Sequence, residues 1–346
     1  MHDEQQSHSH FRAMRRVGPR IVAGAALAAM LTGAALATPS SASQTRRTAP
    51  FPLSIAVSTN VNAQAVVAQH LGYFAKVGLK VSLQNYATGV DDLTAVLTGQ
   101  AGIGGGLAFP ILNRLSSNGM GIIATSMRPK PGFYQLALRS PLTSASQLAG
   151  KKVGIITGTD EVYATYELLK HVGVNPASVN FVDFPDLYGA VAALQSGQID
   201  ATLVYPPGVT QAAKISGVHI VPATETGIEP AYMVASKQLL TNRPKVVTRA
   251  LQAMIEANRW MLKHMHAAAD ILGRFVQAPG STLYQSMTVE DYTVSWQPSD
   301  AISFNTIANF LVSQHLAQSP PALRNYLDIN PLKSAERLAG AGAAKS

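Results

Sequence analysis

Cysteine is absent from all 346 residues of the chain. Its absence excludes disulfide bonds, thiolate metal sites, iron–sulfur clusters and a cysteine nucleophile. It also excludes the lipid-anchored cysteine that many exported bacterial proteins carry. A chain of about 300 residues can bury roughly 75% of its unfolded surface, so the fold needs no covalent staples.

Charge of one sign is not concentrated anywhere in the chain. The formal net charge is +8 and only 13% of the residues are charged. Beyond residue 43 the lysines and arginines are scattered rather than gathered in a block. Nucleic-acid-binding proteins need such a basic patch, so we expect no nucleic-acid partner.

Catalytic and metal-binding motifs are also missing. The sequence contains neither G-x-S-x-G nor H-E-x-x-H. His264 and His266 lie two residues apart, which puts them on different sides of a helix and not together on a metal. Acidic pairs such as Asp91–Asp92 have no evident partner base. We therefore expect no catalytic residue, no metal and no cofactor.

Long apolar runs are confined to the N-terminus. Four arginines, at positions 12, 15, 16 and 20, precede an apolar run over residues 21–37, and small residues follow it before Gln44. This is the pattern of a cleaved signal peptide, predicted over residues 1–43. We expect export to the periplasm by the general route, and the Arg15–Arg16 pair leaves twin-arginine export open. The mature protein is expected to be soluble.

The rest of the chain alternates strand and helix patterns. Residues 79–86 alternate apolar and polar side chains, which predicts a strand, and residues 62–74 carry apolar side chains at helical spacing. T-x-x-D boxes at Thr88 and Thr157 are expected to open two helices. This rhythm predicts an α/β fold built on open sheets.

The rhythm occurs twice. Residues 96–104, VLTGQAGIG, echo residues 194–202, LQSGQIDAT, and each reads as a helix end, a glycine, a glutamine and a strand. We therefore predict two similar α/β lobes. Residues 51–137 together with 231–346 are expected to form the first lobe, and residues 138–230 the second.

Several phrases in order over about residues 55–265 carry a family resemblance. They are GYFAKVGLKVSL, LTGQAGIGGG, LRSPLTSASQLAGKKVGIITGT, LQSGQIDATLVYPP, YMVASKQLL and VVTRALQAMIEANRWM. Together they resemble the type-2 periplasmic binding proteins for aliphatic sulfonates, nitrate and thiamine-precursor pyrimidines. The resemblance implies two α/β lobes joined by a hinge, a ligand in the cleft between them, and a permease and ATPase of an ABC importer as partners.

The sequence departs from the family pattern at two places, of which the first is structural and the second bears on the ligand. The family often has an aspartate before the strand that follows the S-G-Q phrase. Asp200 keeps it in the second lobe, whereas Gly102 replaces it in the first. The helix near Thr157 is often uncharged in the family, but here it begins with Asp160 and Glu161. This acidic start disfavours a strongly anionic ligand.

The ligand site is expected beyond the carboxyl ends of the strands, where loops and helix N-termini converge. The candidate ligand-binding residues are Ser58, Thr59, Asn60, Thr88, Gly89, Gly105, Gly106, Phe109, Ser126, Arg128, Phe133, Gly158, Thr159, Asp160, Tyr163 and Tyr205. The type of each residue suggests how it would contact a ligand, and each also has an alternative role in the structure alone.

Three groups carry these roles. The glycine run 104–106 is expected to form a loop that lets a ligand approach the backbone, the alternative being a tight turn. It is not a dinucleotide fingerprint, because Leu107 stands where the third glycine would be. The aromatic residues would form the walls of the site or else pack in the core. Arg128 would pair with a sulfonate or carboxylate, or be a solvated loop arginine. Thr88 and Asp160 could instead belong to capping boxes.

Two functions from different classes follow. The first is an exported, monomeric solute-binding component of an ABC importer. It would be no enzyme, and would capture a small organic solute such as a sulfonate, zwitterion, pyrimidine or aromatic acid by hinge closure. The second is an enzyme on the same fold acting on a small metabolite. The resemblance includes one enzymatic branch that relies on a cysteine-rich motif, which this chain lacks, and a cytoplasmic branch, which the predicted signal peptide disfavours.

Overall fold

The computed structural model describes residues 49–58, 61–224, 226–227 and 229–343. The described residues belong to one compact unit, Thr48–Ser346. The predicted signal peptide, over residues 1–43, lies outside the described residues, as do Thr59 and Asn60.

The first of two sheets contains six described strands in the order β11-β4-β10-β3-β1-β2. β1 runs parallel to β2 and β3, whereas β10 runs antiparallel to β3 and β4. The carboxyl ends of β1, β2, β3 and β4 therefore meet at one edge of the sheet. The strands are β1 (Phe51–Ser58), β2 (Leu79–Tyr86), β3 (Ile103–Leu107), β4 (Met120–Pro129), β10 (Ala231–Ser236) and β11 (Glu290–Asp291).

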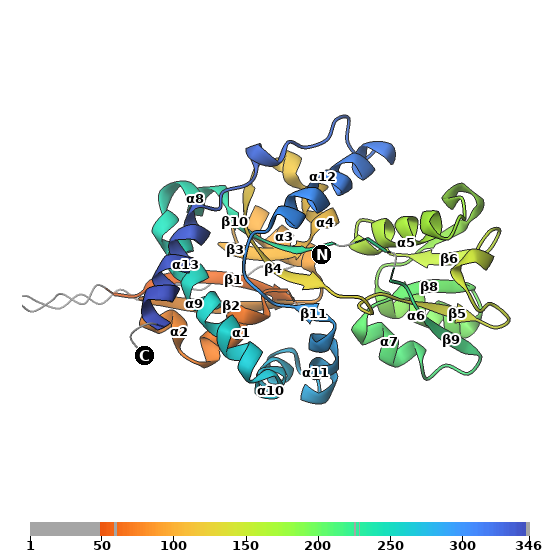
Figure 1. Cartoon of the computed structure of the whole chain (residues 1–346), viewed down its shortest axis with the longest axis horizontal. Coiled ribbons are helices and arrows are strands. Elements are labelled where there is room, and N and C mark those ends of the chain that lie inside the picture. The colour runs from red at the N-terminus through yellow and green to blue at the C-terminus, as the bar shows by residue number, and fades with distance from the viewer. Residues whose placement is uncertain (1–48, 59–60, 225, 228, 344–346) are drawn as a thin grey trace, which may run out of the picture. The chain divides into compact units, whose positions relative to one another are not determined.

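Helices cover both faces of this sheet (Figure 1). The alternation of β1 explains why: Ile55 and Val57 pack on one face, and Ala56 on the other. The first face carries α1 (Ala63–His70), α2 (Tyr73–Lys76), α8 (Lys237–Asn242), α9 (Pro244–Lys263), α10 (Met265–Val276), α11 (Gly280–Thr288) and α13 (Asn330–Ala343). The second face carries α3 (Gly89–Leu97), α4 (Ala108–Leu112) and α12 (Pro298–Ser313). We call this sheet and its helices the first lobe.

The second lobe is a sheet of five described strands in the order β7-β6-β8-β5-β9. Its strands are β5 (Gln135–Arg139), β6 (Lys152–Ile155), β7 (Asn180–Asp183), β8 (Ala201–Val204) and β9 (Val218–Pro222). One face packs on α5 (Asp160–His171), and the other on α6 (Leu187–Ser196) and α7 (Pro206–Ala212).

Short 3-10 helices occur in both lobes. They are η1 (Leu115–Ser117) and η4 (Leu323–Asn325) in the first lobe, and η2 (Ala145–Gln147) and η3 (Pro176–Ser178) in the second.

The two sheets share one strand pattern. In each, three neighbouring parallel strands are followed by an antiparallel strand, which is β10 in the first sheet and β5 in the second. The echoed phrases occupy equivalent places, because one leads from α3 into β3 and the other from α6 into β8. The predicted class, two α/β lobes built on open sheets, is confirmed.

The chain crosses between the lobes twice. The first crossover, residues 130–134, links β4 to β5, and the second, residues 223–230, links β9 to β10. Because β5 begins at Gln135 and pairs with β8 and β9, residues 135–137 belong to the second sheet, a few residues earlier than the predicted boundary. Side chains on these two crossovers prove central to the site.

Candidate ligand-binding site

The first lobe contributes a buried carboxyl group where β1 and α3 meet. Ser58 ends β1, and its Oγ donates to Oδ2 of Asp92 at 3.2 Å. Asp92 lies in the first turn of α3 and is fully buried, and its Oδ1 accepts no hydrogen bond within the described residues. Burial raises the pKa of Asp92 to about 8; the Ser58 bond lowers it and the neighbouring Asp91 raises it. A carboxyl with one free oxygen therefore lies at the carboxyl edge of the sheet.

Thr88 and Gly89 open α3 beside this group. The Thr88 hydroxyl accepts from the Asp91 amide at 3.2 Å, and Asp91 Oδ2 accepts from the Thr88 amide at 3.2 Å. This capping box was one of the two alternatives for Thr88, and it is confirmed. It satisfies two amide donors of the helix start, which reduces what this N-terminus can offer an anion.

The expected glycine loop is wrong, because residues 103–107 form strand β3. Gly105 and Gly106 are buried and pair with Met233 and Tyr232 of β10. A methyl group on Gly105 would lie 2.8 Å from Val61 Cγ1 and 2.9 Å from the Tyr232 carbonyl oxygen. The glycines therefore serve close packing of β3 against its neighbours, a need that the sequence run alone does not distinguish from a loop.

Arg128 is not available to pair with a ligand anion. Its Nε and Nη2 donate to Asp300 Oδ1 at 2.9 Å and Oδ2 at 2.6 Å, and the arginine is buried. Nη1 donates to the Thr293 carbonyl at 3.1 Å and Nη2 also to Ser295 Oγ at 3.1 Å. The guanidinium therefore ties β4 to α12, and neither predicted role, ligand partner or solvated arginine, describes it. The hydroxyl of Ser126, two residues earlier, is also used within the protein, because it donates to the Ala231 carbonyl at 3.3 Å.

In the second lobe, α5 begins at Asp160, and Thr159 rather than Thr157 is its N-cap. Gly158 has φ +85°, a left-handed conformation that a helix cannot include, so the predicted box at Thr157 does not form. The Thr157 amide instead donates to Asp183 at 2.8 Å. Thr159 donates its hydroxyl to the Ile156 carbonyl at 2.7 Å and makes no side-chain cap.

Asp160 meets the first crossover. The Tyr134 hydroxyl, on that crossover, donates to Asp160 Oδ2, and Tyr134 is 3% exposed. Burial raises the pKa of Asp160, although the bonds from Tyr134 and from its own backbone lower it. The capping alternative for Asp160 is therefore wrong, and the residue links the crossover to the start of α5.

Glu229 brings the second crossover to the same place. Its Oε2 accepts from the Phe109 amide of α4 at 2.9 Å, while its Oε1 accepts no hydrogen bond within the described residues. Glu229 is fully buried and Glu161, the second residue of α5, is 3% exposed with its Oε1 also unpartnered. Burial, and then the charge of Asp160, raise the pKa of both glutamates well above its usual range. We call Asp160, Glu161 and Glu229 the carboxyl cluster.

Aromatic side chains surround the carboxyl cluster. Phe133 stacks on Tyr205 with ring centres 6.1 Å apart and packs edge-on against Tyr134 at 4.8 Å. Tyr163 packs edge-on against Phe310 of α12 at 5.1 Å. Burial, and then the charges of acids that include Asp160 and Glu161, raise the pKa of both Tyr134 and Tyr205. Of the predicted aromatic residues, Phe133 and Tyr205 therefore pack together beside Tyr134, which binds Asp160, and Phe109 binds Glu229 through its backbone amide.

Sequence reasoning missed four members of this arrangement: Asp92 and Glu161 as buried acids, Tyr134 and Glu229. Glu161 directly follows the predicted residue Asp160, and Asp92 lies three positions after Gly89. An acidic residue on the buried side of a helix start is a signal that could have found them. Glu229 lies in a connection between strands, where no periodicity marks a side chain as buried. Only the three-dimensional arrangement of the two crossovers shows that Glu229 belongs to the site.

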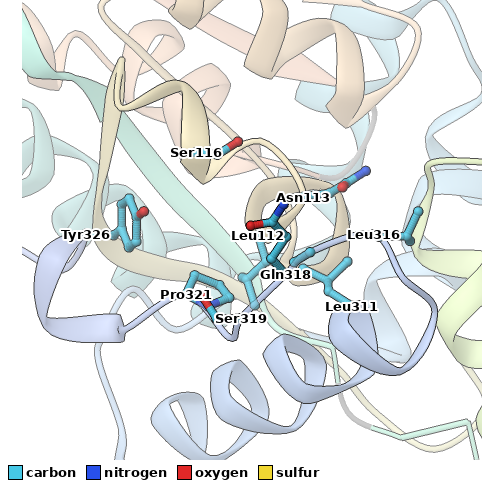
Figure 2. Close-up of a pocket in the computed structure, with 10 residues that line it drawn as sticks. Leu112, Asn113, Ser116, Leu311, Leu316, Gln318, Ser319, Pro321 and Tyr326 are labelled. Atoms are coloured by element: carbon cyan, nitrogen blue, oxygen red, sulfur yellow. The ribbon is translucent and has the colours of Figure 1, made fainter.

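A separate hollow lies away from these residues (Figure 2). It has a volume of about 280 Å³ and forms between the end of α4 and the chain that follows α12. Its lining is Leu112, Asn113, Ser116, Leu311, Leu316, Ala317, Gln318, Ser319, Pro321 and Tyr326. It shares no residue with the predicted site or the carboxyl cluster.

Two kinds of feature are absent from the described part of the chain. No group of three or more His, Asp or Glu side chains there could hold a metal ion. No helix in the same residues is long and apolar enough to cross a bilayer.

Solved structures similar to this one include binding proteins and an enzyme. The periplasmic aliphatic sulphonate binding protein SsuA of Escherichia coli aligns with TM-score 0.71 and 17% identity, over 81% of this chain and 92% of that one. The alkanesulfonate-binding protein SsuA of Xanthomonas axonopodis pv. citri, bound to MOPS, aligns with TM-score 0.66, 17% identity and coverage of 80% and 96%. The desulfurization enzyme DSZB aligns with TM-score 0.65, 16% identity and coverage of 83% and 99%. These likenesses confirm the two-lobed periplasmic binding protein fold.

Sequence comparison gives the family. A putative ABC transporter periplasmic binding protein of Brachyspira hyodysenteriae is 29% identical over 142 residues, which is 40% of this chain and 40% of that protein. The alignment thus spans well under half the length of that relative. The model of the NMT1/THI5-like family matches residues 60–268. These residues include β2 to β10, both crossovers and the carboxyl cluster. The chain belongs to the NMT1/THI5-like family.

Proposed function

We propose that this protein is the exported solute-binding component of an ABC-type importer, and that it captures a small organic solute between its two lobes by hinge closure. One observation carries the proposal. Both crossovers place a buried polar side chain against the other elements of the candidate site, Tyr134 on Asp160 and Glu229 on the Phe109 amide. A solute that binds there touches the hinge itself, so binding and lobe closure are coupled.

The relatives support this role. The curated relative is a putative ABC transporter periplasmic binding protein, and two of the similar structures are sulfonate-binding proteins. By this analogy the partners are a membrane permease and its ATPase, and the site of action is the periplasm. We propose that the protein acts as a monomer, with residues 1–43 as its cleaved signal peptide.

The alternative, an enzyme on the same fold, draws on the likeness to DSZB. Another structure of that enzyme is of a mutant with serine in place of a cysteine, in complex with biphenyl-2-sulfinic acid. The present chain has no cysteine at any position, so it offers no thiol for chemistry of its own. The hydrogen bonds of its carboxyl cluster come from a tyrosine hydroxyl and a backbone amide. We therefore propose binding without turnover.

A thermal-shift screen of the purified protein tests the proposal. The panel contains sulfonates, taurine, nitrate, pyrimidines, aromatic acids and aromatic amines. A ligand at about 100 times its dissociation constant adds roughly 2.7 kcal/mol of stability, which raises Tm by a few degrees. Small-angle scattering on each hit then measures the radius of gyration, which we expect to fall on binding.

Two further results would decide between the functions. Recovery of the hit unchanged after long incubation, measured by mass spectrometry, supports a binding protein, whereas conversion to a product establishes the enzyme. A tight ligand that leaves the scattering curve unchanged would contradict hinge closure. Retention of the protein with an intact leader in the cytoplasm would contradict the proposed localisation.

A further inference from the structure

The carboxyl cluster differs from the other buried acids of this protein. Asp300 is paired with Arg128, and Asp92 accepts a hydrogen bond from Ser58. Glu290 is contacted by the Tyr292 hydroxyl. Glu161 and Glu229 each keep one oxygen without a hydrogen-bond donor among the described residues, as Asp92 does. They differ from Asp92 in place, because Glu229 lies on the second crossover and Glu161 follows Asp160, which binds Tyr134 of the first. Both side chains are at least nine-tenths buried, so water does not freely supply the missing donor.

Glu229 is held in a defined orientation. The Phe109 amide, at the N-terminal end of α4, binds Oε2 at 2.9 Å. The amide fixes one side of the carboxyl and leaves Oε1 directed away from that bond. After burial, the charge of Asp160 raises the pKa of Glu229, and the charge of Glu229 contributes to the raised pKa of Tyr134, Tyr163 and Tyr232. Within the described part of the chain, no lysine or arginine forms an ion pair with an acid of the cluster.

An ionised carboxylate buried without a partner is costly, and such groups take up a proton instead. Removing one member of a buried charge pair costs several kcal/mol for the same reason. Once ionised, the three acids repel an anion, and two of them have a free acceptor atom. They favour a molecule that brings N–H donors and positive charge, because that molecule completes the missing bonds.

We infer that the carboxyl cluster binds a positively charged or amidine-like nitrogen group of an organic solute, with Glu229 as the principal acceptor and Glu161 as the second. The inference rests on the proposed solute-binding function and narrows its ligand class. The stacked pair Phe133–Tyr205 and the ring of Tyr163 provide apolar surface for the rest of a flat solute. Sulfonates and nitrate, the ligands implied by part of the family resemblance, do not match this charge pattern.

A matched set of probes tests the inference directly. Benzamidine, benzamide and benzoate share one ring and similar shapes but carry positive, zero and negative charge; benzenesulfonate adds a second anion. We expect calorimetry on the purified protein to give the tightest binding for benzamidine, at least tenfold tighter than for benzamide, and no measurable binding of the anions. Equal binding of the three carboxyl-derived probes, tighter binding of an anion, or no binding of benzamidine at all would overturn the inference.

The pH dependence gives a second, variant-free readout. Benzamidine stays protonated across the whole range between about pH 5 and about pH 8, so changes in affinity report the protein. Because burial raises the pKa of Glu161 and Glu229 in the empty site and a bound cation would lower it, benzamidine affinity should rise with pH, by up to about tenfold per unit for each proton released. Binding should also release protons, which calorimetry in two buffers of different ionisation enthalpy measures. Affinity that falls with rising pH would contradict the assignment.

Glu229→Gln tests the principal acceptor without removing the group that binds Phe109, because the amide oxygen still accepts. We expect this variant to weaken benzamidine binding at least tenfold, to leave benzamide binding within about threefold, and to flatten the pH dependence. Glu167→Gln is the matched control: it makes the same change on α5, where Glu167 pairs with Lys170 at 3.0 Å outside the cluster. Equal loss in both variants would mean that net charge, and not Glu229, determines binding.

The failure of this inference is distinguishable from failure of the proposed function. If the broad panel gives an anionic ligand that contracts the protein in scattering, solute binding stands and the nitrogen-group assignment fails. If no solute of either charge binds, both fail.

Discussion

Arg128 and Asp300 form a two-point ion pair that joins β4 to the first turn of α12, with Nε–Oδ1 at 2.9 Å and Nη2–Oδ2 at 2.6 Å. Asp300 also accepts from the Gln297 amide at 2.7 Å, and its backbone carbonyl accepts from the Tyr232 hydroxyl at 2.8 Å. One aspartate thus connects β4, β10 and α12. The pair fixes the C-terminal helices on the first lobe and leaves the site without its best candidate cation.

Arg128→Met should therefore lower stability much more than ligand affinity. Removing one partner of a buried pair leaves Asp300 uncompensated, which costs about 3–5 kcal/mol. The double variant Arg128→Met with Asp300→Leu should recover part of this loss, because no unpaired charge remains. Urea unfolding of the two single variants and the double variant measures the coupling. A stable Arg128→Met protein that loses solute binding would instead make Arg128 a ligand contact.

Gly105 and Gly106 should respond differently to a single added methyl group. Gly105→Ala places the methyl 2.8 Å from Val61 and 2.9 Å from the Tyr232 carbonyl, so the strands must shift, at a cost of about 1–3 kcal/mol. Gly106→Ala meets its nearest atoms at 3.4 Å, which is close to ordinary contact. Thermal unfolding of the two variants compares them. Equal destabilisation would show that the glycines matter for chain flexibility and not for packing at residue 105.

The fold was largely predictable because its elements carry strong local signals. The alternation of residues 79–86 gives β2, the Thr88–Asp91 box opens α3, and Pro244 is the first residue of α9. The echoed phrases at 96–104 and 194–202 occupy equivalent places in the two sheets. Each of these signals depends on residues within a few positions of one another.

The site was less predictable because its decisive contacts join residues far apart in sequence. Arg128 and Asp300 are separated by 172 positions, and Phe109 and Glu229 by 120. No residue close to Arg128 in sequence indicates that its guanidinium forms an ion pair within the protein. No residue close to Glu229 in sequence indicates that Glu229 is buried. The Thr157 box failed for a local reason instead, because Gly158 takes a left-handed conformation that delays the helix start to Asp160.

Asp92 should make the stability of the ligand-free protein depend on pH. Its pKa is raised from 3.8 to about 8 in the folded state, first by burial. Because this pKa is raised on folding, the contribution of Asp92 to the free energy of unfolding is complete below about pH 4 and is lost as pH rises toward 8. Each pKa unit corresponds to about 1.4 kcal/mol. Asp92→Asn, which still accepts from Ser58, should therefore equal the unaltered protein in acid and exceed it in stability near pH 8.

The difference in unfolding free energy between Asp92→Asn and the unaltered protein, measured by urea at several pH values, is the quantity to follow. Taking this difference cancels the pH dependence of all other groups. Glu167→Gln provides the control and should show no comparable trend. A difference that stays constant with pH, or that grows in acid, would mean that Asp92 is ionised throughout and has a partner in solution.

Glu229→Gln should have two opposite effects, and together they separate a ligand-binding acid from a structural one. In the ligand-free protein, burial and Asp160 raise the pKa of Glu229, so the acid reduces stability as pH rises through its folded-state pKa. The neutral glutamine avoids that cost and keeps the bond from Phe109, so Tm near neutral pH should rise by a few degrees. Benzamidine binding should weaken in the same variant. A residue kept for packing alone would show lower Tm and unchanged affinity. A gain in stability accompanied by a loss of binding is the expected signature of a group that is unfavourable until a solute pairs with it.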